Sequence, residues 1–246
     1  MKYTLRHGIR DGMPICLGYF PVAFAFGIFA RGQGIGTLEV ILISMLNVTS
    51  AGQLASVPLF VSGAPLYEMA LTQLVINLRY SLMSVTLSQK VDGSVRLRDR
   101  FLVAFVNTDE VFAVSAAKDG LVGRSYLYGL ILPPYLGWLG GTVFGALAGD
   151  ILPALLVASL GIAIYGMFLS IIIPAARDSR ATLFAELIAA VLSCLFAYAP
   201  LLSSVSSGFA IIISSVSASL LLAVLAPLPP VGAPIAARKE DCSDDA

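Results

Sequence analysis

The sequence predicts an all-α fold: a polytopic helical membrane protein with about six full transmembrane helices and two broken or re-entrant segments. Of its 246 residues, 58% are hydrophobic and only 12% are charged, whereas charged residues make up about a quarter of a typical soluble domain. The apolar residues gather into eight segments, each about long enough to cross a hydrocarbon core of about 30 Å as a helix. The basic residues cluster between these segments, as is typical of cytoplasmic loops.

The first apolar segment follows Lys2, Arg6 and Arg10, an arrangement that imitates a secretory signal. We interpret it as an uncleaved first span, because it is about 18 residues long, rich in aromatic residues and followed by many more apolar segments. In order along the chain, the eight segments are 13–30, 38–61, 65–88, 100–117, 126–148, 151–173, 182–199 and 207–226.

Three parts of the chain follow from these segments. Residues 1–12 form a cytoplasmic amino terminus, residues 13–226 a single transmembrane domain, and residues 227–246 a cytoplasmic tail. The tail is rich in proline and then in charged residues, and it has no apolar periodicity. We therefore expect it to be disordered.

Eight simple crossings do not fit the charges. With the amino terminus in the cytoplasm, they would place the basic loop 89–100 outside, against the positive-inside rule. If the second and fourth segments instead enter and leave by the same face, all 15 basic residues except Arg31 and Arg79 lie on the cytoplasmic side or in the cytoplasmic tail. We predict this arrangement, with both termini cytoplasmic; eight spans with one exceptional loop is the alternative.

Polar residues interrupt the same two segments. Non-helical backbone at membrane depth is tolerated where it lines a cavity, and broken helices mark the binding sites of many transporters. The sequence therefore predicts that the two interruptions border a polar site. The residues concerned are Asn47, Thr49, Ser50 and Gln53 in the second segment, and Asn107, Thr108, Asp109 and Glu110 in the fourth.

The fifth segment carries a row of small residues. Glycines recur there at multiples of four residues, so on a helix they share one face and let another backbone approach closely. We expect this face to pack against another helix of the same chain; an interface with a partner subunit is the alternative. The glycines are Gly129, Gly137, Gly141, Gly145 and Gly149.

Three charged residues lie inside apolar segments: Arg79, Asp109 and Glu110. A charge at mid-membrane costs about 2.5–3.5 kcal/mol even on the insertion scale, so such groups pair with each other or line a polar cavity. Arg79 presents a planar fork of donors that suits a carboxylate. It can bind a substrate or neutralise Asp109 or Glu110, and one acidic residue can instead carry a proton or cap a half-helix.

Several classes of function find no support in the sequence. The only histidine is His7, and the three cysteines, Cys16, Cys194 and Cys242, have no metal-ligand spacing. We therefore predict no enzyme, no metal and no cofactor. No phosphate-binding Walker motif is present, so active transport would use a gradient or the ATPase of another chain. The formal net charge is zero, which gives no basis for a nucleic-acid partner.

Four motifs follow one another along the chain: the run from Gly18 to Gly27, then Gln53, then Asn77-Leu78-Arg79, and then Thr108-Asp109-Glu110-Val111-Phe112. Together they resemble the AzlC family. The resemblance covers about residues 5–226, and the order and spacing of the motifs are specific. That family comprises the large subunits of bacterial branched-chain amino acid exporters, which work with a small membrane partner of the AzlD type.

This resemblance implies a subunit of the bacterial cytoplasmic membrane that moves valine, leucine or isoleucine outward with its AzlD-type partner. A zwitterionic amino acid needs a cation for its carboxylate and acceptors for its ammonium group, in an apolar surround. We predict that the substrate-binding residues are Arg79, Asn77, Gln53, Tyr19 and Asp109, and that Glu110 and Asp109 are the candidates for proton coupling.

The sequence departs from the family pattern at two positions. Tyr80 stands where the family commonly has histidine, and Ser50 where it commonly has glycine. The first change removes a group that titrates near neutral pH, so both substrate and coupling ion stay open. Two other functions also stay open: a structural subunit whose partner carries the pathway, and a passive channel for small solutes.

Overall fold

The computed structural model describes residues 3–149, 153, 155, 166, 169, 172–177, 179–200, 202 and 204–225. The chain forms two compact units, Met1–Gly166 and Met167–Ala246, which are described separately below. Most of the predicted span 151–173 and the predicted tail 227–246 lie outside the described residues, so these two predictions stay open.

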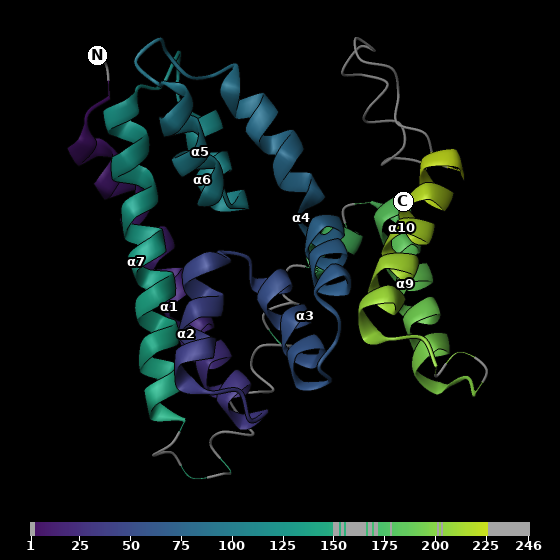
Figure 1. Ribbon diagram of the computed structural model, residues 1–246. Coiled ribbons are helices and arrows are strands. Elements are labelled where there is room, and N and C mark those ends of the chain that lie inside the picture. Colours follow the sequence, from purple (N-terminus) through teal and green to yellow (C-terminus); the bar gives the residue numbers. More distant parts are fainter. Residues whose placement is uncertain are drawn as a thin grey trace. The chain divides into compact units, whose positions relative to one another are not determined.

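The described elements are all α-helices, apart from one isolated β-bridge (Figure 1). The prediction of an all-α, polytopic membrane protein is therefore confirmed. Four of the described helices, α1, α7, α9 and α10, are long and apolar enough to cross a membrane. The helices are α1 (Leu5–Gly32), α2 (Thr37–Leu46), α3 (Ser50–Val61), α4 (Leu66–Ser88), α5 (Leu97–Phe105), α6 (Asp109–Ala116), α7 (Arg124–Ala148), α9 (Arg180–Tyr198) and α10 (Ser207–Leu225).

Both segments that the sequence predicts to be broken are broken at their polar residues. The second segment divides into α2 and α3 at residues 47–49, and the fourth divides into α5 and α6 at residues 106–108. At each break a threonine with extended backbone precedes the next helix, Thr49 before α3 and Thr108 before α6. Such residues favour helix N-termini because their short polar side chains compete with helical hydrogen bonding.

The α5–α6 pair returns to the end of the unit from which it starts. The loop before α5 and the loop after α6 meet in the β-bridge between Val91 and Val122. The Asp92 N–H donates to the Val122 carbonyl at 3.0 Å, and the Val122 N–H donates to the Lys90 carbonyl at 2.9 Å. Hydrogen bonds from Ser94 hold the pKa of Asp92 below its ordinary value. This geometry is that of a re-entrant segment.

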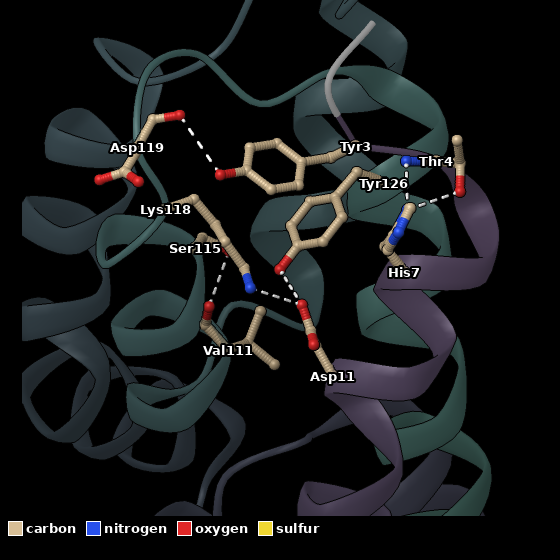
Figure 2. A network of polar contacts seen from close by, with 9 residues as sticks. All are labelled: Tyr3, Thr4, His7, Asp11, Val111, Ser115, Lys118, Asp119 and Tyr126. Atoms are coloured by element: carbon tan, nitrogen blue, oxygen red, sulfur yellow. Dashed lines mark hydrogen bonds and ion pairs between the residues drawn. The ribbon is translucent and has the colours of Figure 1, made fainter.

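The amino terminus lies at the same end (Figure 2). Lys118, which follows α6, forms an ion pair of 2.7 Å with Asp11 on α1. The Tyr126 hydroxyl at the start of α7 donates to the same Asp11 carboxylate at 2.9 Å, and the Tyr3 hydroxyl donates to the Asp119 carbonyl at 3.4 Å. This end, which we call the basic end, gathers Arg6, Arg10, Lys90, Arg96, Arg98, Lys118 and Arg124.

The α2–α3 pair starts from the opposite end of the first unit. Helix α1 leads away from the basic end for 28 residues, or about 40 Å. The last turn of α1 and the last turn of α3 line one cavity, to which Phe29, Gln33, Pro58 and Ser62 contribute. The two broken segments therefore enter the unit from opposite ends, and their breaks lie between those ends.

Helices α1 and α7 pack side by side in parallel along their length (Figure 1). A Cβ atom added at Gly141 would lie 2.3 Å from the Phe20 carbonyl oxygen, and one at Gly145 would lie 2.1 Å from that of Phe24. Glycines of α1 pack against the α7 backbone in the same way, since a Cβ at Gly8 would lie 2.2 Å from the Tyr126 carbonyl oxygen. The prediction that the glycine face packs within the chain is confirmed, and its partner is α1.

Helix α1 begins at Leu5, eight positions before the apolar segment that predicts it. The extra turns carry Gly8 and Gly12, both buried against α7. Backbone hydrogen bonding continues there because the close packing of two helices stabilises these turns, although they also carry the charged residues Arg6, Arg10 and Asp11.

In the second unit α9 and α10 pack against each other. Ser179 caps the start of helix α9, because its hydroxyl accepts a hydrogen bond of 3.2 Å from the Thr182 N–H. Gly208, Ser214 and Ala218 are the buried residues of α10.

Candidate functional site

The two helix breaks meet at a cavity of about 200 Å³ within the first unit. Residues of both breaks line it, and Asn77 and Tyr80 of α4 close one side. Because the breaks enter from opposite ends, this cavity lies between the two ends of the first unit. Its lining residues are Leu46, Asn47, Val48, Thr49, Asn77, Tyr80, Ala104, Phe105, Asn107 and Thr108.

Helix ends of both polarities border the cavity. The last residues of α2 and α5 line it, as do the residues immediately before α3 and α6, Thr49 and Thr108. A helix carries partial negative charge at its C-terminus and partial positive charge at its N-terminus. Neither Thr49 nor Thr108 caps its helix with a side-chain hydrogen bond. The cavity therefore offers environments for a cationic group and for an anionic one.

Aromatic side chains of α1 and α7 hold the breaks in place. The Trp138 indole donates to the Asn47 carbonyl at 3.3 Å, and the Tyr135 hydroxyl donates to the Met45 carbonyl at 3.1 Å. These bonds satisfy carbonyls near the end of α2 that have no intrahelical partner. Tyr19 packs edge-on against Trp138, with ring centroids 5.4 Å apart.

Tyr19 also reaches the start of α6. Its hydroxyl lies 2.7 Å from the Thr108 hydroxyl and contacts the Glu110 carboxylate in a short hydrogen bond. The structure thus brings two residues of the predicted site, Tyr19 and Glu110, into direct contact. A carboxylate that accepts a bond from a tyrosine can exchange a proton through a connected hydrogen-bonded network.

Four amide-bearing groups form a second network at the cavity. The Gln73 Nε2 donates to the Gly52 carbonyl at 2.8 Å. The Gln73 Oε1 accepts from Asn47 Nδ2 at 3.0 Å and from Asn77 Nδ2 at 3.2 Å. A Cβ on Gly52 would lie 2.6 Å from Gln73 Oε1, so a larger residue at position 52 would displace the Gln73 amide. Asn77 lines the cavity, and its contact with a substrate stays a prediction.

Arg79 and Asp109 form an ion pair of 2.8 Å, with 56% and 48% of their side chains exposed. The guanidinium also donates to the Tyr80 hydroxyl at 3.1 Å and lies over that ring, 4.9 Å from its centroid. The expected partner of Arg79 is thus Asp109 rather than Glu110. Neither charged group lines the cavity; each adjoins a residue that does, Tyr80 and Thr108 respectively.

Gln53 lies apart from these groups. It is fully buried and donates to Ser44 in a short hydrogen bond, and the Ser44 and Thr142 hydroxyls lie 2.6 Å apart. This chain of polar side chains links α2, α3 and α7, which favours a structural role. The predicted contact between Gln53 and a substrate stays a prediction.

An apolar cavity of about 290 Å³ adjoins the polar one. The two share Ala104 and Asn107 in their linings, and the Asn107 Nδ2 donates to Ser84 at 3.2 Å between them. Val85, Leu87, Val103 and Leu127 are among the apolar residues, and Arg100 lies at the edge nearer the basic end. An apolar side chain therefore fits next to a polar head group.

The sequence did not single out several residues of this site as ligands or supports. Asn107 and Thr108 were expected to border a polar site but not to bind a substrate, whereas Gln73, Tyr135 and Trp138 lie in ordinary helical sequence. Trp138 is the only tryptophan of the chain, which is the one local feature that distinguishes it. Among the described residues, no group of three or more His, Cys, Asp or Glu side chains could hold a metal ion.

Comparison with known proteins identifies relatives. The family described as "AzlC protein" matches residues 14–152. An uncharacterized membrane protein of Archaeoglobus fulgidus is 36% identical over 171 residues, which are 69% of this chain and 74% of that protein. The inner membrane protein YgaZ of Escherichia coli is 31% identical over 178 residues, covering 69% and 72% of the two chains. No solved structure matches the chain.

Proposed function

This chain belongs to the AzlC family, which is associated with membrane transport, and from that premise we propose that it exports hydrophobic amino acids of the branched-chain class. It does so together with a small membrane subunit of the AzlD type, and an ion gradient drives the export. The membrane is the cytoplasmic membrane, with the basic end of the first unit on the cytoplasmic side.

One observation carries the proposal: two helix breaks from opposite ends meet at one cavity. A free amino acid is a zwitterion, and in a low-dielectric site each of its charges needs a compensating group. The N-termini of α3 and α6 suit its carboxylate, and the C-termini of α2 and α5 suit its ammonium group. The adjoining apolar cavity suits a branched aliphatic side chain.

The ion pair next to the cavity supplies the movable charges. Arg79 can release Asp109 and take the substrate carboxylate instead, because both side chains are half exposed and an exchange between two carboxylates conserves the charge balance. Glu110, bonded to Tyr19, is the candidate for the coupling proton, with Asp109 as the second candidate.

Flux measurements in proteoliposomes test the proposal against a passive channel and a structural subunit. With the small partner present, labelled leucine should accumulate against its concentration gradient when a pH gradient is imposed. Flux that only equilibrates leucine indicates a channel.

Leucine binding to this purified chain alone separates the remaining alternatives. Binding supports a substrate site in this subunit. If the pair of subunits transports leucine while this chain alone binds none, the pathway belongs to the partner and this chain is a structural subunit.

A further inference from the structure

We propose that the side-chain oxygens of Asn77 and Asn107 bind the ammonium group of the transported amino acid. The proposal rests on the function proposed above and assigns one half of the zwitterion to two named atoms. It gives Asn107 a direct role in binding, although the residue was expected only to border a polar site.

The orientation of the Asn77 amide follows from its neighbours. The Gly52 carbonyl can only accept, so the Gln73 Nε2 must face it. The Gln73 Oε1 then faces Asn77, whose Nδ2 donates to it. The Asn77 Oδ1 is therefore turned away from this network, and the Gly52 carbonyl prevents the opposite arrangement.

Two carbonyl oxygens at the cavity lack donors. Asn77 Oδ1 and Asn107 Oδ1 are both buried and without a hydrogen-bond partner, and both residues line the cavity. Asn107 is only 3% exposed, and its Nδ2 is occupied by Ser84. A buried acceptor without a donor is costly, so a ligand that brings donors gains from filling this site.

The surroundings select a positively charged ligand group. Amide oxygens only accept hydrogen bonds, and an ammonium group supplies three donors. The C-terminal ends of α2 and α5 add partial negative charge. Asp109, the carboxylate that would otherwise compete, does not line the cavity. A free alkali cation also seeks carbonyl oxygens, so the experiment must separate it from the ammonium group.

Trp138 reports on this cavity. It is the single tryptophan of the chain, and its indole bonds to the Asn47 carbonyl at the lining. The purified full-length chain is titrated with leucine and followed by tryptophan fluorescence. Asn107→Leu and Asn77→Leu remove the acceptors, and Asn107→Ala replaces the leucine variant if that one does not fold. Asn107→Asp keeps an oxygen in place while removing the donor to Ser84.

Thr72→Val is the matched control. The Thr72 hydroxyl oxygen is likewise buried and without a partner, and it is on the same helix as Asn77, but Thr72 does not line the cavity. We expect leucine affinity to fall about tenfold or more in the acceptor-removing variants. In Asn107→Asp, leucine affinity should stay within about threefold of the wild type or become higher. In Thr72→Val, leucine affinity should stay within about threefold of the wild type.

Different outcomes overturn different claims. Unchanged affinity in the acceptor-removing variants refutes the assignment, as does an Asn107→Asp variant as weak as Asn107→Leu, because the donor to Ser84 would then matter. The melting temperature is also measured without added leucine, in sodium chloride and in choline chloride. If sodium but not choline raises the melting temperature of the wild type, and of neither Asn77→Leu nor Asn107→Leu, the two oxygens bind a free cation instead. Wild-type protein that binds no amino acid refutes the proposed function itself.

Discussion

Arg79 and Asp109 are joined by an ion pair whose strength depends on its surroundings. In water an exposed pair contributes about 0–1 kcal/mol, whereas at membrane depth an unpaired charge costs several times more. Half of each side chain is exposed, so the pair can open at low cost where water reaches it. This property suits a carboxylate-binding arginine that must exchange partners during transport.

Arg79→Lys tests the role of the guanidinium. Lysine keeps the charge but loses the planar fork, so we expect transport of leucine to fall about tenfold or more while the amount of inserted protein is unchanged. Uptake into proteoliposomes and the yield of monodisperse protein measure the two quantities.

The purely structural interpretation makes a different prediction for the same residue. If Arg79 only neutralises Asp109, then Arg79→Ala combined with Asp109→Ala should restore transport that either change alone abolishes. Normal leucine export by that double variant would place the binding site elsewhere.

Glu110→Gln separates coupling from binding. Glutamine keeps the size of the side chain and an acceptor for Tyr19 but cannot carry a proton. We expect accumulation driven by a pH gradient to be lost, while exchange of internal for external leucine persists. Asp109→Asn serves as the comparison; if it abolishes the coupling and Glu110→Gln does not, the titrating residue is Asp109.

At the scale of elements, the parallel contact of α1 and α7 forms the frame on which the site is built. Tyr19 on α1 and Trp138 on α7 contact each other and hold the two breaks. Glycines bring the two backbones close enough for this, since dispersion contacts rather than the hydrophobic effect drive helix association in lipid. The contact of α1 with α7 therefore fixes the positions of the two breaks that line the cavity.

Gly141→Ala tests this frame, with Gly140→Ala as a neighbouring control. A Cβ at position 141 would lie 2.3 Å from the Phe20 carbonyl oxygen, whereas one at position 140 meets only a Phe20 ring carbon at 3.9 Å. Overpacking of this kind costs about 1–3 kcal/mol. Thermal unfolding in detergent should show a lower midpoint for Gly141→Ala and little change for Gly140→Ala; equal midpoints would mean that the helices separate without cost.

At the scale of the whole molecule, the ends of the first unit differ in charge. The loops before α5 and after α6 are joined by the β-bridge at the basic end, and the connection after α3 lies at the other end. Because basic loops stay in the cytoplasm, the two joined loops should face inward together.

Cysteine labelling measures this topology. In a background without Cys16, Cys194 and Cys242, single cysteines at Gly93 and Leu121 should resist an impermeant thiol reagent in intact cells and react after permeabilisation. A cysteine at Ser62, exposed at the other end, should react from outside. Gly93 has no close neighbours, and Leu121 is exposed. Reaction of a cysteine at either position from outside therefore contradicts the re-entrant arrangement of α5 and α6.

The sequence by itself determined the class of fold, the positions of both breaks and the small face of α7. Each of these is a local property: the length of an apolar segment, polar residues inside it, or glycines at helical spacing. The ion pair of Arg79 with an acidic residue was also predictable, because isolated charges in apolar segments need partners.

Only the tertiary structure decided which residues share the cavity. Asn77, Asn107 and Thr49 come from three separate segments, and although their polarity predicted a shared site, nothing in their local sequence says which of their atoms face one cavity. It also placed Gln53 in the polar chain to Ser44 rather than at the cavity, and it assigned Asp109 to Arg79 and Glu110 to Tyr19. Such pairings depend on the rotation and register of packed helices, which the contact of α1 with α7 sets at a distance along the chain.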